Sequence, residues 1–141
     1  MTAMPPRFDI TSDEIALLMT RFYQKVRADA VLGPVFAAHV GAEDAPWPKH
    51  EAKIGAFWRN AILFDRSYSG NPMQKHLAAH GVIAEHFEIW LAHFDATLAE
   101  VFPEGRTAAS FSALAHRIGR GLRLGVADRD RPKGAVPSLF G

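Results

Sequence analysis

The stretch Asn71-Pro72-Met73-Gln74-Lys75-His76 lies between two long segments in which apolar residues recur at helical spacing. Asn71 is a suitable N-cap and Pro72 a suitable first helical residue, so a short helix carrying His76 is predicted to begin here. Loops are expected over residues 67–72 and 78–82. The centre of the chain is therefore predicted to contain a long helix, a short helix with a histidine, and a second long helix.

The remaining sequence extends this pattern to four long and two short helices. The first long helix follows a capping box, with Thr11 as N-cap and Glu14 three residues later. Gly33 and Pro34 are expected to interrupt the chain before a short helix over 35–40, and Thr107 to cap the last long helix. The apolar stripes of the four long helices contain Ile15, Leu18, Met19, Phe22 and Val26; Ile54, Phe57, Trp58 and Ala61; Ile83, Phe87, Trp90, Leu91, Phe94, Leu98 and Phe102; and Phe111, Leu114, Ala115, Ile118 and Leu122.

No alternation typical of a β-strand competes with these stripes, so the chain is predicted to be all-α. Its 141 residues favour a single domain, which we expect to span 1–126. Residues 127–141 are expected to form a flexible C-terminal tail.

The composition excludes several classes of protein. A formal net charge of +1 does not provide the positive field that nucleic-acid binding requires. No run of 18 apolar residues is present, and residues 1–10 lack an apolar signal core, so we expect a cytoplasmic protein without a membrane partner. The chain has no cysteine, which rules out disulfides, iron–sulfur clusters and covalent haem attachment.

Seven histidines are present, and no pair has the HExxH spacing of a zinc protease. His50 begins an apolar stripe, and from the pattern alone it is more often a half-buried residue bonded to a backbone carbonyl. Tyr23 and Trp90 also border apolar stripes, where such residues usually belong to the core. His86 and His93 flank Trp90 and are expected at the surface. Spacing alone therefore leaves the function open.

Several short motifs, in this order along the chain, resemble those of the group III truncated haemoglobins. The resemblance runs from Phe8 to Val126. It rests on Phe22-Tyr23, Leu32-Gly33-Pro34-Val35-Phe36, His50-Glu51-Ala52-Lys53-Ile54-Gly55-Ala56-Phe57-Trp58, Tyr68-Ser69-Gly70-Asn71-Pro72 followed by Lys75-His76, and Phe87-Glu88-Ile89-Trp90-Leu91.

The resemblance implies a truncated globin, a two-over-two helical sandwich around a non-covalent haem b. It implies that His76 is the proximal ligand of the iron and that Tyr23, His50 and Trp90 lie on the distal side. Lys53 and Lys75 would meet the haem propionates. Four further residues would pack on or near the haem, namely Phe36, Ile54, Phe57 and Trp58.

The same resemblance implies a protein that binds O2, CO and NO. A bound gas ligand that gains negative charge would accept hydrogen bonds from the Tyr23 hydroxyl and the Trp90 indole, each worth ~1.5–3 kcal/mol. High affinity and slow release are therefore expected, which suit scavenging, sensing or redox chemistry. His50 either gates the distal entrance or binds iron as a sixth ligand, and the sequence does not decide between these roles.

Two other functions remain open at this point. One is a haem redox enzyme, a nitric oxide dioxygenase or a peroxidase-like protein, which would need a reductase partner. The other is a helical binding module without a cofactor, whose aromatic residues serve only as core. A monomer or a weak homo-oligomer is expected in either case.

Overall fold

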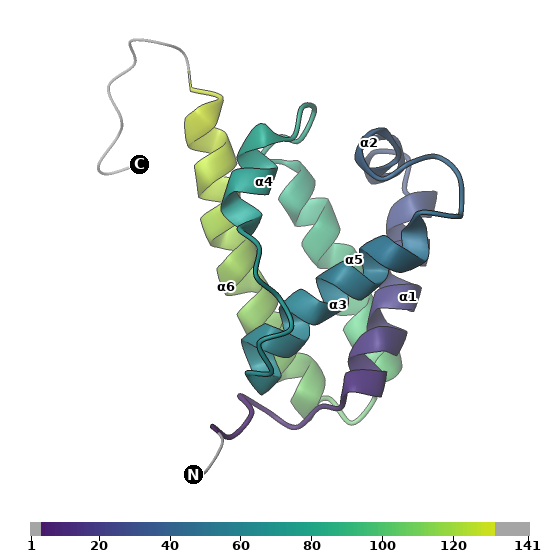
Figure 1. Ribbon diagram of the computed structural model, residues 1–141, viewed down its shortest axis with the longest axis vertical. Coiled ribbons are helices and arrows are strands. Elements are labelled where there is room, and N and C mark those ends of the chain that lie inside the picture. Colours follow the sequence, from purple (N-terminus) through teal and green to yellow (C-terminus); the bar gives the residue numbers. More distant parts are fainter. Residues whose placement is uncertain (1–3, 132–141) are drawn as a thin grey trace.

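The computed structural model describes residues 4–131, and these form six α-helices without any β-strand (Figure 1). The prediction of an all-α chain with four long and two short helices is confirmed. The helices are α1 (Ser12–Ala28), α2 (Leu32–His39), α3 (Trp47–Leu63), α4 (Pro72–Ala78), α5 (His86–Val101) and α6 (Arg106–Arg129).

The four long helices form two pairs. Helix α1 packs against α3, α5 packs against α6, and contacts between α1 and α5 join the two pairs. This arrangement is the two-over-two sandwich expected from the sequence. The short helices attach to its edges, with α2 against α1 and α5, and α4 beside α6 (Figure 1).

Local side-chain caps explain where two of the helices begin. The Thr11 hydroxyl accepts the Glu14 N–H at 3.1 Å, and the Glu14 carboxylate accepts the Thr11 N–H at 2.9 Å. At the start of α4, the side chain of Asn71 accepts the Gln74 N–H at 3.1 Å, and Pro72 is the first helical residue. The capping box and the short helix carrying His76 are both confirmed.

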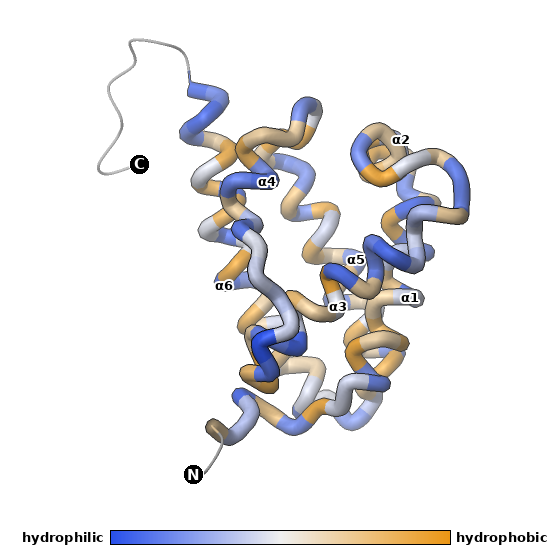
Figure 2. Tube along the Cα trace, in the orientation of Figure 1, coloured by the Kyte–Doolittle hydropathy of each residue, from blue (hydrophilic) through white to orange (hydrophobic). Residues whose placement is uncertain are grey.

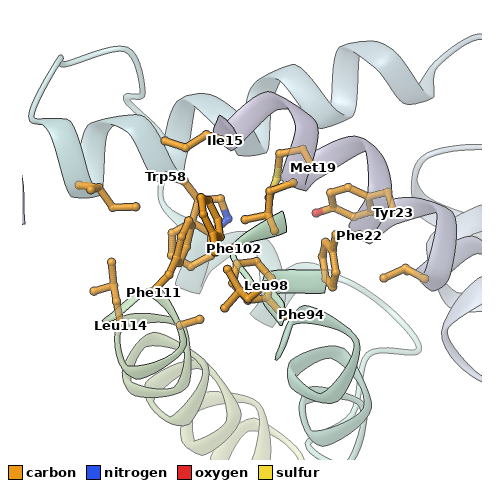
Figure 3. Close-up of a cluster of buried hydrophobic side chains, with 14 of the residues drawn as sticks. Ile15, Met19, Phe22, Tyr23, Trp58, Phe94, Leu98, Phe102, Phe111 and Leu114 are labelled. Carbon is orange, nitrogen blue, oxygen red and sulfur yellow. The ribbon is translucent and has the colours of Figure 1, made fainter. Parts of the chain in front are cut away.

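The core combines aromatic and aliphatic side chains, most of them from the four long helices (Figure 3). The rings of Trp58 and Phe111 lie 4.9 Å apart, and Phe94 lies 5.1 Å from both Phe22 and Phe111. Hydrophobic and hydrophilic residues are interspersed along every long helix (Figure 2), as expected when one helical face is buried. Each large apolar side chain buried in this way contributes about 1.5–3 kcal/mol to stability.

The start of α2 differs from the prediction. The helix begins at Leu32 rather than at Pro34, because the Asp29 carboxylate accepts the N–H groups of Val31 and Leu32 at 2.8 and 2.9 Å. Pro34 is tolerated two residues further on, since the N–H groups of a first helical turn have no partner within the helix. Gly33 is required for packing, because a Cβ there would lie 2.7 Å from the Arg27 carbonyl oxygen.

Three other expectations about the second half of the chain were wrong. Helix α5 begins at His86, three residues after Ile83, whose side chain is exposed. Thr107 does not cap α6, since its hydroxyl donates to the Asp9 carbonyl at 3.1 Å and the helix begins after Gly105. His93 is not a plain surface residue, because its Nε2 lies 2.7 Å from the Asp29 carboxylate.

The end of α6 extends beyond the expected end of the helical domain. The helix continues to Arg129, three residues past position 126, and Asp130 follows as its C-cap. Most of the expected tail, residues 132–141, lies outside the described residues. Within residues 4–131, no helix is both long and apolar enough to span a bilayer.

Candidate functional site

A cavity of about 340 Å³ lies within the helical sandwich, and every one of the six helices contributes to its wall. This volume falls in the range of small-molecule and cofactor sites, roughly 300–1,000 Å³. All the residues singled out from the sequence line this one cavity. They are Tyr23, Phe36, His50, Lys53, Ile54, Phe57, Trp58, Lys75, His76 and Trp90.

His76 lies in the last turn of α4, with one ring nitrogen bonded to its own helix. Its Nδ1 lies 2.7 Å from the Pro72 carbonyl oxygen. A carbonyl only accepts, so Nδ1 carries the proton and Nε2 keeps a lone pair. The ring also packs against Phe87, with centroids 5.6 Å apart. This is the orientation that a metal-binding imidazole requires, with the non-ligating nitrogen held by an acceptor.

A second group of cavity residues gathers around Tyr23. Its ring lies 5.0 Å from that of His50 and 6.0 Å from that of Phe36. The Tyr23 side chain is only 2% exposed, and it lies beside Phe22 in the core (Figure 3). Burial, followed by the negative charge of Glu51, raises the pKa of Tyr23 well above its usual range. The hydroxyl therefore stays protonated, and Tyr23 is part of the cavity wall.

His50 has a buried nitrogen without a partner. Its Nε2 makes no hydrogen bond to any residue within 4–131, so the expected bond to a backbone carbonyl is not present at this atom. Burial lowers the pKa of His50 to about 4, and the charges of Lys53 and Lys75 add to the effect. The imidazole is therefore neutral near pH 7. A buried polar atom without a partner is rare in a folded protein and often marks a functional site.

Trp90, on α5, joins the cavity to the aromatic core. Its ring stacks on Phe94 at 5.3 Å and meets Phe22 edge to face at 5.2 Å. An indole nitrogen is only a donor, so Trp90 adds a second possible donor to the cavity wall besides Tyr23.

Two lysines from different helices meet at the cavity. Lys53 belongs to α3 and Lys75 to α4, and both are exposed. The contact with the Lys53 side chain, followed by burial and the like charge of Lys53, lowers the pKa of Lys75. Two ammonium groups this close repel each other, and an anionic group between them would relieve the repulsion. The pair therefore suits a ligand that carries carboxylates.

The rest of the wall is apolar. Trp58 is 1% exposed and belongs to both the core and the cavity wall, whereas Phe36, Ile54 and Phe57 are half-buried. Like His50, Trp58 has a buried nitrogen, Nε1, without a partner among residues 4–131.

Several wall residues were not singled out by the sequence analysis. Tyr68 packs on Phe57 at 5.4 Å, and Gly119 lies so close to Leu91 that a Cβ there would be 3.2 Å away. His39 joins α2 to the loop after α4, with its Nε2 2.7 Å from the His80 carbonyl. Other wall residues, including Phe87, Ile118 and Leu122, belong to the predicted apolar stripes. They were not recognised as cavity residues because an apolar stripe does not distinguish core residues from residues that line a cavity.

The site as a whole fits an iron porphyrin. The apolar wall suits the flat macrocycle, and the lone pair on His76 Nε2 suits its metal. The lysine pair suits its two carboxylates. The protonated Tyr23 hydroxyl and the neutral His50 face the same cavity and suit a small ligand.

Comparisons with known proteins agree with this chemistry, although no protein-family model matches the chain. The chain is 44% identical over 95 residues to a curated protein, the group 3 truncated hemoglobin ctb of Campylobacter jejuni. The matched part covers 67% of this chain and 75% of that protein. Its fold is also similar to the crystal structure of a group III truncated hemoglobin from Campylobacter jejuni. That match has a TM-score of 0.82 at 35% identity and covers 88% of this chain and 97% of the solved chain.

Proposed function

The chain belongs to the group III truncated haemoglobins, and from this premise we propose that it holds a non-covalent haem b in the cavity, with His76 as the proximal ligand. The sequence-based prediction of the family is confirmed by these relatives. The haem and the roles of individual residues are our proposal, supported by the chemistry of the cavity wall.

The proximal residues would bind and orient the cofactor. When bound, haem would supply an iron that can bind a diatomic gas. The Nδ1–H bond to the Pro72 carbonyl holds the His76 imidazole in the tautomer whose Nε2 donates a lone pair. Lys53 and Lys75 would each meet a propionate, and the apolar side chains of Phe36, Ile54, Phe57 and Trp58 would exclude water.

The distal residues would decide how long a gas stays bound. Tyr23 keeps its proton, and its ring lies 5.0 Å from that of His50. The buried Nε2 of His50 has no partner among residues 4–131, and this nitrogen beside Tyr23 is the observation that carries the proposal. Trp90 offers an indole N–H, and His50 is neutral. A charge-assisted hydrogen bond is worth ~1.5–3 kcal/mol, and ~1.4 kcal/mol corresponds to a factor of ten in rate. We therefore propose binding of O2, CO and NO with high affinity and slow release.

The test is the absorption spectrum of the purified protein, supplemented with haem, in the ferrous state with and without CO. We expect a Soret band that shifts when CO is added. His76→Ala should weaken or abolish the band, while the matched control His80→Ala, an exposed histidine four residues away, should retain it. A wild-type protein that takes up no haem would instead support a helical binding module without a cofactor.

A second candidate is a haem redox enzyme, a nitric oxide dioxygenase or a peroxidase-like protein. It is favoured by the same donors, because a ligand held by both Tyr23 and Trp90 leaves too slowly for delivery but remains long enough to react. Turnover with NADH, a reductase and nitric oxide tests it. Stable gas binding without such turnover would leave binding as the function.

A further inference from the structure

Helix α4, which carries His76, is weakly anchored by packing alone. It has seven residues, none of them buried, and among the helices its backbone lies against α6 only. A helix this short is not stable on its own in water. Some other interaction must therefore hold the position of His76.

Arg129, in the last turn of α6, makes that interaction. Its Nη1 donates to the carbonyls of His76 at 3.1 Å and Leu77 at 3.2 Å, and reaches that of Ala79 at 3.4 Å. Its Nη2 donates to the Val82 carbonyl. Asp130 orients the guanidinium through contacts at 2.8 and 3.0 Å.

These contacts supply hydrogen-bond donors to backbone carbonyl groups at the carboxyl end of α4. The last four carbonyls of a helix have no partner within it, and the negative end of the helix dipole favours a cation. The planar guanidinium has five N–H donors, so one side chain serves two carbonyls of the last turn and two in the loop beyond it.

A glycine one turn before Arg129 allows α4 to approach α6 closely. A Cβ at Gly125 would lie 2.5 Å from the sulfur of Met73, so α4 packs directly on the backbone of α6 at this point. Gly125 and Arg129 are four residues apart on α6 and thus face the same direction. They contact the beginning and the end of α4 respectively.

We propose that Arg129 is a positioning residue that holds α4, and with it the imidazole of His76, at the cavity. Arg129 is not part of the cavity wall and acts through the backbone of α4. The part of this inference that concerns an iron ligand rests on the proposed function.

The test compares Arg129→Met with the matched control Arg120→Met, which removes an exposed arginine from the same helix. In the full chain as purified, hydrogen–deuterium exchange of residues 75–79 should become about tenfold faster in Arg129→Met and stay unchanged in the control. In the haem-loaded ferrous protein, the iron–histidine stretching band in the resonance Raman spectrum should shift or broaden. Haem transfer to an acceptor globin should become about tenfold faster.

The variant Arg129→Lys distinguishes the loss of the Arg129 hydrogen bonds from a general loss of stability. A lysine keeps the charge but has no planar fork, so it should restore exchange and the Raman band in part. This variant also keeps the inference testable if Arg129→Met folds poorly.

Two outcomes would overturn the inference while leaving the proposed function intact. One is a haem-loaded Arg129→Met with wild-type exchange in α4 and an unmoved Raman band. The other is exchange that rises equally in all helices with the band unmoved, because the arginine would then stabilise the fold as a whole. A wild type that takes up no haem would contradict both the proposed function and the role of His76 as an iron ligand. Hydrogen–deuterium exchange in α4 would still test whether Arg129 holds this helix in place.

Discussion

At the scale of single residues, the cavity contains polar groups that contribute little to folding. Tyr23 is buried, and His50 Nε2 is buried without a protein partner among residues 4–131. Burying a polar group without a hydrogen bond costs stability. Such groups are therefore better explained by a ligand than by the fold.

Tyr23→Phe should separate these two explanations. The haem-free variant should be as stable as the wild type or slightly more stable, by up to ~1 kcal/mol, because burying the hydroxyl costs desolvation free energy. The haem-loaded variant should release O2 roughly 10–100-fold faster, because one donor is removed. Urea unfolding and stopped-flow displacement by CO measure the two effects. Reduced stability with an unchanged release rate would contradict the proposed role.

The lowered pKa of His50 predicts how stability depends on pH. The folded-state pKa of about 4 lies below the unfolded value of 6.5, so between these values the unfolded state binds more protons. His50 therefore costs the haem-free protein stability as the pH falls from 6.5 to about 4. His50→Gln should lose less stability than the wild type over that window in urea unfolding. The exposed control His80→Gln should keep the wild-type slope, and equal slopes for all three proteins would refute the prediction.

At the scale of elements, charged side chains outside the two short helices decide where these helices lie. Arg129 holds the end of α4, and Asp29 starts α2 and also binds His93 of α5. Both helices contribute residues to the cavity wall. The position of the wall thus depends on a few charged side chains rather than on packing alone.

Asp29→Ala should destabilise the protein by about 1–2 kcal/mol at pH 7, because the start of α2 loses its acceptor. The hydrogen bond from His93, followed by those from the N–H groups of Leu32 and Val31, lowers the pKa of Asp29 to about 2. Its contribution is therefore complete above the unfolded value of 3.8 and is lost as the pH falls toward 2.

Urea unfolding at several pH values measures this effect. The matched control is Asp44→Ala, which removes a 95% exposed carboxylate from a surface pair with Arg27 and should cost less than ~1 kcal/mol. Equal losses in the two variants at pH 7 would show that Asp29 acts only as a surface charge.

At the scale of the whole molecule, a cavity walled by all six helices should couple ligand binding to folding. Haem that binds only the native state at 100 times its Kd adds ~2.7 kcal/mol of stability. We therefore expect haem to raise Tm by roughly 10 °C, and its removal to reverse the change. Calorimetry with and without haem measures this, and His76→Ala should show a smaller rise. An unchanged Tm at saturating haem would contradict binding in this cavity.

The sequence alone was enough to predict the features that depend on local interactions. These are the all-α class, the capping box at Thr11, the Asn71 cap and the short helix that carries His76. Each depends on residues within one or two turns, and the motif order was enough to indicate the family. Only the tertiary structure decided the rest. It placed Arg129 on α4, brought Asp29 to His93, and left the buried nitrogens of His50 and Trp58 without a hydrogen-bond partner among residues 4–131. Those outcomes depend on contacts between residues up to 64 positions apart in the sequence. Hydrophobic periodicity indicates which face of a helix is buried but not which element covers it.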